Sequence, residues 1–310
     1  MKIIKVITKQ SEIADTLNKI GSEALLSANS KAIIVTDEKR PTNKEMMEAI
    51  NQIDKTGASK AKIYKQERDA LIEIYESANG KRWYNNTNWC SDEKPVSEWH
   101  GIDVDPEYVF VTDNKTVGTM GSVTSIDLSR NNIYCGKLED NGRISPRIKE
   151  LTQLKYINFS YNFIHGIIPE ELYELKELEE LYLHFNQLNC TISGKIGQMK
   201  KLRIIQLDHN HLTGPIPSTL GNLSDLETLC LHVNNLDNGY ILVRLKSKIN
   251  KPALRRNSTS IPASIAKLTK LTKFMAYQNQ LTGSIPNAIK QHPNYSNWQL
   301  ETQQNNVKLK

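Results

Sequence analysis

A short phrase of the form L-x-L-x-x-N recurs from residue 126 to residue 303 and constrains the fold more than any other feature of the chain. Its asparagines stand at Asn131, Asn162, Asn186, Asn210, Asn234 and Asn279. Their spacings of 31, 24, 24, 24 and 45 residues indicate a 24-residue unit with insertions of seven and twenty-one residues. A degenerate seventh copy ends at Gln303, 24 residues after Asn279. Such a period predicts a solenoid, because one unit cannot bury its apolar face alone.

Apolar and polar residues alternate within each phrase, as in a short strand with one buried face. We therefore expect Leu181 and Leu183 to point into the core, and Tyr182 and His184 to point outward. An asparagine side chain has two donor hydrogens and one acceptor oxygen, which can satisfy backbone groups where the chain leaves the strand. The repeated asparagines are expected to form a ladder inside the solenoid.

The second half of the unit follows the pattern L-x-G-x-I-P-x-x-L-x-x-L, seen at residues 164–175, 212–223 and 281–289. Here Gly permits a tight turn, Ile packs inward from a short second strand, and Pro caps a helical turn. The pattern resembles the plant-type leucine-rich repeat, a family known from receptor ectodomains and also found in bacterial and protist proteins. The resemblance implies an α/β leucine-rich repeat solenoid with a parallel β-sheet on its concave face and short strands and helical or 3-10 turns on its convex side.

The rest of the chain divides into further segments. Residues 1–57 predict a small separate βαβα unit, with two parallel strands at 3–7 and 32–35, a helix capped by Ser11, and a second helix that opens with a capping box at Thr42 and Glu45. Its role is not indicated by any motif. Residues 122–292 hold six repeats with an insertion at about 239–260, and residues 293–310 hold the degenerate seventh strand, a C-terminal cap and a tail.

Residues 65–121 resemble the N-terminal cap that precedes plant-type repeats, with a helix over 67–78 followed by Trp83, Trp89 and Trp99. The two cap cysteines of the family are replaced by Ser97 and Val104, so the cap disulfide of the family is missing. We expect the three indoles to close the end of the core instead. A disulfide between Cys90 and Cys135 is geometrically possible, although free thiols are the expected state.

Charge and hydropathy narrow the partner classes. The net charge is +6, and no apolar run is long enough to span a membrane. The insertion carries six Lys and Arg residues and no acid, but it lacks the interleaved aromatic residues of a nucleic-acid platform. We expect a solvated segment there, nucleic acid is not the expected partner, and no membrane span is expected.

Outward positions on the stacked strands define the surface that can bind. Aromatic residues and histidines gather on the middle repeats, and such side chains supply rigid contact area at interfaces. The candidate protein-binding residues are Tyr156, Tyr161, Tyr182, His184, Phe185, Asp208, His209, His232 and Tyr277.

His184, Asp208 and His232 occupy one outward position on three neighbouring strands, which raises the alternatives of a metal site, a catalytic pair, a pH-sensitive contact or an ordinary polar ladder. Side chains on a flat ladder are expected to diverge, and Cys230 belongs to a neighbouring column. We therefore predict no metal site, no catalytic residue and no cofactor.

The sequence thus favours a non-enzymatic, monomeric recognition module that binds another protein or a peptide on its concave face, in adhesion, sensing or scaffolding. The family resemblance implies a secreted or cell-surface protein, whereas the lack of an export signal at Met1 and of the cap disulfide favours the cytoplasm. The alternative is an intracellular effector or enzyme whose first 57 residues carry the activity while the repeats select the substrate.

Overall fold

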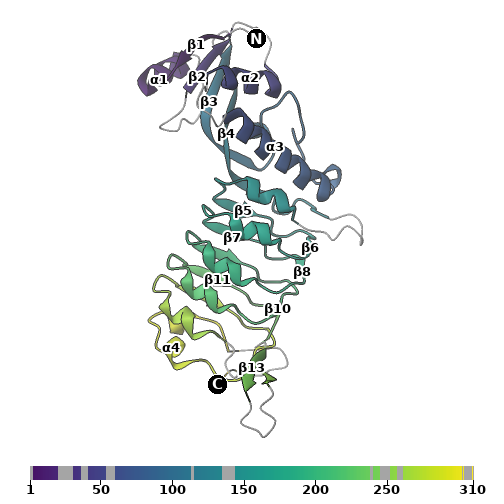
Figure 1. The fold of residues 1–310 in the computed structure, drawn as a ribbon, viewed down its shortest axis with the longest axis vertical. Coiled ribbons are helices and arrows are strands. Elements are labelled where there is room, and N and C mark those ends of the chain that lie inside the picture. The colour runs from purple at the N-terminus through teal and green to yellow at the C-terminus, as the bar shows by residue number, and fades with distance from the viewer. Residues whose placement is uncertain are drawn as a thin grey trace.

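The computed structural model describes residues 3–19, 31–35, 41–53, 60–112, 115–134, 144–237, 240–244, 252–256, 261–301, 303 and 309. The molecule is elongated (Figure 1). An α/β part that contains the N-terminus lies at one end, and the coils of the repeats stack from it toward the C-terminus.

A nine-stranded sheet runs through the whole molecule in the order β1-β2-β3-β4-β5-β7-β9-β11-β15. Its strands are β1 (Ile3–Ile7), β2 (Lys31–Val35), β3 (Ile102–Thr112), β4 (Lys115–Asp127), β5 (Tyr156–Asn158), β7 (Glu180–Tyr182), β9 (Ile204–Gln206), β11 (Thr228–Cys230) and β15 (Lys273–Met275). From β4 onward all pairings are parallel, with the first apolar position of each phrase opposite that of the next. The predicted repeat solenoid with a parallel sheet is confirmed.

The other side of the coils is built from shorter elements. Its two-residue strands pair as β6 (His165–Gly166) with β8 (Gln187–Leu188), and as β10 (Thr213–Gly214) with β12 (Asn235–Leu236). The 3-10 turns of the repeats are η3 (Pro146–Glu150), η4 (Glu170–Glu174), η5 (Gly194–Gln198), η6 (Ser218–Asn222) and η7 (Ala263–Lys267), and the sixth repeat has the short helix α4 (Asn287–Lys290) in this place. Gly214 has a φ of 73°, and Pro217 is the N-cap of η6, which are the roles that the pattern predicts.

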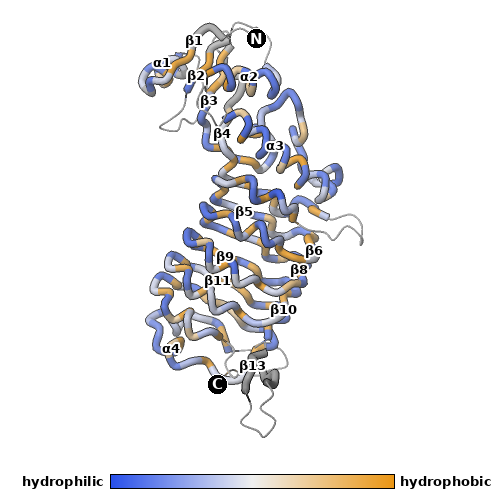
Figure 2. Tube along the Cα trace, viewed as in Figure 1, coloured by the Kyte–Doolittle hydropathy of each residue, from blue (hydrophilic) through white to orange (hydrophobic). Residues whose placement is uncertain are grey.

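The apolar side chains of successive coils form one continuous core. Leu183, Leu207 and Leu231 are fully buried and belong to the same cluster. Hydrophobic and hydrophilic residues alternate along each coil (Figure 2). Burying a leucine of this kind contributes on the order of 2 kcal/mol, so the core is the largest stabilising term of the solenoid.

The repeated asparagines form the expected ladder, which we call the asparagine ladder (Asn131, Asn162, Asn186, Asn210, Asn234 and Asn279). In the fourth copy, the Oδ1 atom of Asn210 accepts a hydrogen bond of 2.9 Å from the backbone N–H of Leu188 in the preceding coil. Its Nδ2 atom donates to the carbonyls of Leu183 and Leu207 at 3.0 and 3.1 Å. The same pattern recurs at Asn162, Asn186, Asn234 and Asn279, so each of these joins two coils. Asn131 instead joins the first coil to the cap, because its Oδ1 atom accepts from the N–H of Asn85 and its Nδ2 atom donates to the Asn85 carbonyl.

Gln303 takes the place of asparagine in the degenerate seventh copy. Its side chain donates to the carbonyls of Leu300 and Ala276 and accepts from the N–H of Asn279. Trp298, from the same copy, is buried and stacks on His292 with ring centroids 4.5 Å apart. A 3-10 turn, η8 (Tyr295–Asn297), precedes it. Where a closing strand was predicted, the described chain makes a single parallel bridge to β15, between Met275 and Gln299, instead of a full strand.

Three indoles close the other end of the repeat core, as predicted. The rings of Trp83 and Trp89 lie 4.9 Å apart, those of Trp89 and Trp99 lie 5.3 Å apart, and all three side chains are buried. Two 3-10 turns, η1 (Gly80–Arg82) and η2 (Val96–Glu98), hold this segment. The preceding helix α3 (Lys60–Ser77) starts earlier than the predicted residue 67. Cys90 is a free thiol, as are Cys190 and Cys230, while Cys135 lies outside the described residues.

The prediction of a separate unit with two parallel strands over residues 1–57 is wrong in its strand direction. β1 and β2 pair antiparallel, and β2 continues the sheet by pairing parallel with β3. The apolar pattern marks the buried side of each strand but carries no signal for its direction. The helices are α1 (Gln10–Lys19) and α2 (Asn43–Ile53), and Ser11 lies inside α1 instead of capping it.

This N-terminal part shares its core with the cap. Ile33, Met46 and Ile50 pack in one cluster with residues of α3, β3 and β4. The side-chain amide of Asn43 donates to the carbonyls of Ser91 and Lys94 in the cap. The predicted capping box is present, because Thr42 and Glu45 exchange hydrogen bonds at the start of α2. The described parts of residues 1–57 therefore share a sheet and a core with the cap instead of standing apart from it.

The described part of the insertion forms a hairpin, which the sequence did not predict. β13 (Tyr240–Arg244) and β14 (Pro252–Arg256) pair antiparallel from Tyr240 opposite Arg256 to Arg244 opposite Pro252. The hairpin occurs once in the chain, so no repeated pattern marks its two strands in the sequence.

The asparagine ladder generates a stability prediction. Replacing Asn210 with Ala leaves the buried N–H of Leu188 without its acceptor and removes two donors to buried carbonyls, so we expect a loss of about 3 kcal/mol in the free energy of unfolding. The exposed Asn189 is the matched control, and Asn189→Ala should cost less than about 0.5 kcal/mol. Denaturant unfolding of both variants measures the difference, and equal losses would contradict the structural role of the ladder.

Candidate functional site

The residue before each ladder asparagine has a left-handed backbone. Arg130, Tyr161, Phe185, His209, Val233 and Gln278 all have φ values between 52° and 55°. Non-glycine residues adopt this conformation rarely, and only where the surroundings enforce it. Here backbone hydrogen bonds to the next coil do so, for example from the N–H of Phe185 to the carbonyl of Asp208 at 3.0 Å. The six side chains therefore leave the coils in the same direction.

Three of these side chains, Tyr161, Phe185 and His209, are rings that stack face to face, and Arg130 covers one end of the stack. At the other end the row continues into the rings of His232 and Tyr277. The Arg130 guanidinium lies 3.9 Å from the centre of the Tyr161 ring. The Tyr161 and Phe185 rings stack at 4.4 Å, and the Phe185 and His209 rings stack at 3.9 Å. His209 meets His232 edge-on at 5.2 Å, and His232 stacks on Tyr277 at 4.6 Å. We call this set the ring column (Arg130, Tyr161, Phe185, His209, His232 and Tyr277).

Stacking decides which part of each ring a partner can reach. Tyr161 and Phe185 are 38% and 37% exposed although their faces lie against neighbouring rings. What remains open to solvent is the edge of each ring, which carries the positive end of the ring quadrupole. The ring column thus presents a strip of aromatic edges.

The first three coils carry a separate polar cluster on β4, β5 and β7. The Tyr156 hydroxyl lies 3.3 Å from a carboxylate oxygen of Asp127 and accepts from the Asn158 amide at 3.1 Å. The Tyr182 hydroxyl donates to the carboxylate of Glu180 at 2.7 Å, and the Tyr156 and Tyr182 rings lie 5.5 Å apart. Both tyrosines are half-buried, with their hydroxyls already engaged within the chain.

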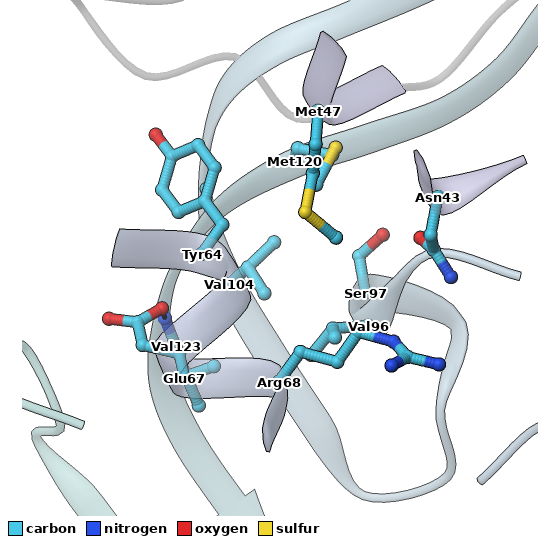
Figure 3. Close-up of a pocket in the computed structure, with 11 residues that line it drawn as sticks. Asn43, Met47, Tyr64, Glu67, Arg68, Val96, Ser97, Val104, Met120 and Val123 are labelled. Carbon is cyan, nitrogen blue, oxygen red and sulfur yellow. Dashed lines mark hydrogen bonds between the residues drawn. The ribbon is translucent and has the colours of Figure 1, made fainter. Parts of the chain in front are cut away.

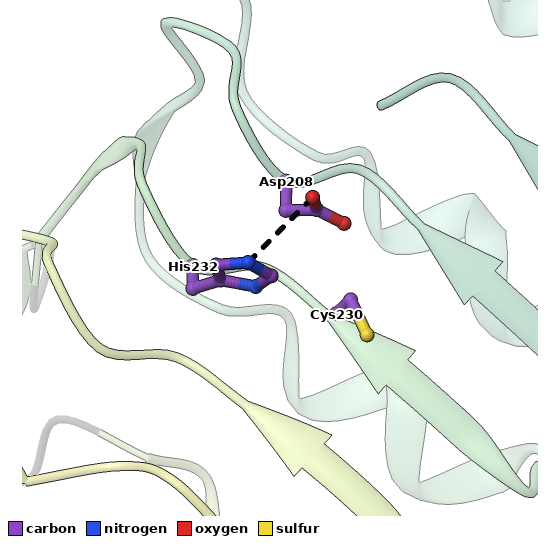
Figure 4. Close-up of side chains that lie close together, drawn as sticks. All are labelled: Asp208, Cys230 and His232. Atoms are coloured by element: carbon purple, nitrogen blue, oxygen red, sulfur yellow. Dashed lines mark ion pairs between the residues drawn. The ribbon is translucent and has the colours of Figure 1, made fainter. Parts of the chain in front are cut away.

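His232 of the ring column also belongs to a buried cluster with Asp208 and Cys230 (Figure 4). Cys230 ends β11, and His232 follows it by two residues on the same side of the chain. Asp208 comes from the neighbouring coil, because β9 and β11 pair with Gln206 opposite Cys230. Potential ligand atoms of the three residues lie within 4.8 Å of one another, and we call the set the Asp-Cys-His cluster.

The charges of the cluster are set by burial. Burial lowers the pKa of His232 and of His184, partly offset by the Asp208 carboxylate, so both imidazoles are neutral at pH 7. Asp208 is 5% exposed, and its carboxylate is held by the Nδ1 atom of His209 at 3.0 Å. Burial raises the pKa of the Cys230 thiol to about 11. A buried thiol that stays protonated is a weak nucleophile, which argues against a nucleophilic role.

The structure brings together most of the predicted binding residues but not all of them at the surface. Tyr161, His184, Phe185 and His209 form the middle of the face, with His184 edge-on to Tyr161 at 5.2 Å. Asp208 and His232 are buried, at 5% and 7% exposure, so they lie below the surface that the sequence predicted them to form.

Two features escaped the sequence reasoning. The expectation that side chains on the ladder diverge is wrong for Asp208, Cys230 and His232, which converge. The signal was present in the Cys-x-His spacing, because residues two apart on a strand share a face. Arg130, which covers one face of Tyr161, was not among the predicted binding residues.

Two hollows lie outside the Asp-Cys-His cluster. A cavity of about 20 Å³ between α2, α3 and the cap is lined by Met47, Glu67, Arg68, Val104 and Met120 among others (Figure 3). It has room for one water-sized molecule and not for a substrate. A wider hollow of about 460 Å³ lies where the ring column ends, lined by Tyr277, Gln278, Trp298, Gln299, Leu300 and Glu301. In the described part of the chain, no helix is both long and apolar enough to cross a membrane.

Comparisons with known proteins agree with the stacked coils. Family models described as leucine-rich repeats match residues 147–188 and 201–223. The crystal structure of PEPR1-AtPEP1 is similar to this chain with 25% identity and a TM-score of 0.54, over 77% of this chain and 28% of that chain. No curated protein sequence matches the chain.

Two further solved structures show the same fold. The Arabidopsis receptor kinase HAESA, in complex with the peptide hormone IDA and the co-receptor SERK1, is 19% identical with a TM-score of 0.55, over 77% of this chain and 33% of that chain. The leucine-rich repeat ectodomain of the receptor kinase SOBIR1 from Arabidopsis thaliana is 23% identical with a TM-score of 0.50, over 71% of this chain and 97% of that chain. The chain spans about a third or less of the PEPR1 and HAESA chains.

Glu67 in the small cavity generates a pH prediction. Burial raises the pKa of its carboxyl group from 4.5 to about 7, partly offset by the N–H of Val123, which donates to it at 3.1 Å. The unfolded chain loses this proton near pH 4.5 while the folded chain keeps it until about pH 7, so the residue costs stability increasingly as the pH rises through that range. The full cost, about 3 kcal/mol, is present above pH 7 and absent below pH 4.5.

Glu67→Gln removes this titration. We expect the free energy of unfolding of the variant, relative to wild type, to rise by about 3 kcal/mol between pH 4 and pH 8. Glu76→Gln, at an exposed position of the same helix, should show a nearly constant difference over that range. Urea unfolding at several pH values gives both curves, and parallel curves for wild type and Glu67→Gln would contradict the raised pKa.

Proposed function

Because the repeats of this chain belong to the plant-type leucine-rich repeat family, we propose that the chain is a non-enzymatic recognition module that binds an extended peptide or protein segment along the ring column. The observation that carries the proposal is the ring column itself. Tyr161, Phe185 and His209 occupy left-handed positions that asparagine or glycine would adopt at lower cost, so the backbone conformation does not account for these three rings. Stacking of the rings on one another and contact with a partner account for them.

Pre-stacked rings suit a binding surface. Each ring of the column is fixed by its neighbours at centroid distances of 3.9 to 5.2 Å. Little side-chain entropy is therefore lost when a partner docks, and aromatic anchors of this kind supply much of the binding energy at interfaces. The exposed edges of Tyr161 and Phe185 offer the positive end of the quadrupole to carbonyl or carboxylate oxygens of the partner.

The dimensions of the column indicate the length of the occupant. The column crosses six strands, from β4 to β15, and neighbouring strands lie about 4.8 Å apart, so it is about 24 Å long. An extended chain advances about 3.3 Å per residue, which gives a segment of about seven residues. The hollow beside Tyr277 could receive a side chain at one end of that segment.

The comparisons support a peptide or protein as the class of partner. HAESA was crystallised with a peptide hormone and a co-receptor, and it shares the fold of this chain. The similarity to receptor ectodomains also supports an extracellular or cell-surface setting. Adhesion, sensing and scaffolding all remain within this proposal.

The alternative of an effector whose first 57 residues carry an activity has no supporting observation among the described residues of that segment. Their buried side chains are apolar, among them Ile13, Ile33, Met46 and Ile50, except for Asn43, whose amide holds the cap. We therefore assign this segment a packing role.

Peptide selection tests the proposal. Heptapeptides selected from a random display library on the immobilised full chain are expected to bind at least about 30-fold more weakly to Phe185→Ser, because an aromatic anchor contributes about 2 kcal/mol. Phe163→Ser is the matched control, since Phe163 is 46% exposed and lies outside the ring column. Selected peptides that bind Phe185→Ser and Phe163→Ser equally would exclude the ring column as the binding surface, as would a selection that enriches no peptide.

A further inference from the structure

The Asp-Cys-His cluster has the composition of a metal site. It combines a carboxylate, a thiol and an imidazole, and it is the one group of three potential ligands that converges within the described residues. All three side chains are buried, at 5%, 2% and 7% exposure for Asp208, Cys230 and His232. Buried polar groups of this kind normally occur with their hydrogen bonds made or with a metal ion.

His232 does not have its hydrogen bonds made. Its Nδ1 atom is buried without a partner, and its Nε2 atom lies 3.6 Å from Asp208 Oδ2. That distance is longer than a hydrogen bond between nitrogen and oxygen. The imidazole nevertheless turns an edge toward the carboxylate (Figure 4). The buried imidazole therefore faces the carboxylate at a distance too long for a hydrogen bond and short enough for both atoms to bind one ion, which is a second observation that points to a ligand between them.

The distances fit a tetrahedral ion. Ligand atoms about 2.1 Å from a zinc ion are separated from each other by about 3.4 Å. The 3.6 Å between His232 Nε2 and Asp208 Oδ2 is close to this edge length. Cys230 Sγ lies within 4.8 Å of the other two ligand atoms, so a side-chain movement of about 1 Å would complete three corners of the tetrahedron.

The surroundings hold the ligands in place. His209 Nδ1 contacts the Asp208 carboxylate at 3.0 Å, which orients the oxygen ligand from outside the cluster. Tyr277 stacks on His232 at 4.6 Å and fixes its ring plane. Cys230 and His232 sit on one strand, and the parallel pairing of β9 and β11 fixes Asp208 beside them. The cluster is thus built on rigid elements.

From this geometry we infer that Asp208, Cys230 and His232 bind one zinc ion, with a fourth coordination position open to water or another group. Zinc accepts sulfur, nitrogen and oxygen ligands together, and three protein ligands with one open position is a familiar zinc arrangement. The Cys230 proton is released to solvent when its sulfur binds the ion. Met275 Sδ lies 3.9 Å from Cys230 Sγ and would favour copper(I), but the Asp208 oxygen is a hard ligand that favours zinc.

Metal titration of the full chain, freed of any affinity tag and treated with a chelator, tests the inference. Isothermal titration calorimetry with Zn²⁺ is expected to show one saturable site per chain. Co²⁺ is expected to give the ultraviolet absorption of a thiolate-bound cobalt ion. Added Zn²⁺ should raise the melting temperature in proportion to the logarithm of its concentration above the dissociation constant. These readouts use no peptide, so they stand or fall independently of the proposed function.

Matched variants locate the site. Cys230→Ala and His232→Phe are expected to weaken Zn²⁺ binding by about tenfold or more and to abolish the cobalt–thiolate absorption. Cys190→Ala and His211→Phe, which change a second free cysteine and an exposed histidine, should leave both signals unchanged. Circular dichroism checks that each variant is folded.

Three outcomes would overturn the inference. The first is a wild-type chain that is folded and binds no Zn²⁺, which decides the question even if both variants fail to fold. The second is binding that persists unchanged in Cys230→Ala and His232→Phe, which would place the ion elsewhere. The third is a competition in which copper(I) displaces Zn²⁺ completely while requiring Met275, which would show that the cluster is a copper site.

Discussion

The dry core of the stacked coils depends on satisfying backbone groups that have no access to water. Each coil turns away from the sheet inside the core, and its N–H and C=O groups would be costly to leave unpaired. The asparagine ladder meets this requirement by bonding its own coil and the preceding one, as Asn210 does with Leu207 and Leu188. The same bonds fix the register of neighbouring coils. Every surface feature of the solenoid inherits that register, because equivalent residues are held directly above one another.

The ring column follows from the asparagine ladder. To direct each asparagine inward, the chain turns through a left-handed residue just before it, and this turn sends the preceding side chain outward in a constant direction. Side chains repeated at the strand spacing of about 4.8 Å are close enough for aromatic rings to stack. Asp208 and His232, each one position before a left-handed residue, are buried and converge with Cys230. A surface of stacked rings and a buried polar cluster are two consequences of one repeated turn.

Features that repeat were predictable from the sequence, and features that occur once were not. The period of 24 residues and the alternation within each phrase predicted the parallel sheet, the core leucines and the ladder, since each was specified several times over. The position of Gln303, 24 residues after Asn279, also predicted that its side chain takes the place of a ladder asparagine. The antiparallel pairing of β1 with β2 and the hairpin of β13 with β14 have no second copy, and a single apolar strand does not encode its direction. The convergence of Cys230 with Asp208 depends on side-chain packing across coils, which the column positions alone do not describe.

The cap shows how this chain closes its core without the disulfide of the related family. Trp83, Trp89 and Trp99 pack against each other, and each indole N–H donates to a backbone carbonyl, so the rings are buried with their polar atoms satisfied. The sheet does not end at the cap, because β4 pairs with β3, and β3 with β2. An end that is covered by paired strands and packed rings does not depend on the redox state of its compartment, unlike one closed by a cystine. The cysteine pattern of the cap is therefore compatible with either side of the cell surface, and the chemistry of the ring column is the better guide to what the chain meets there.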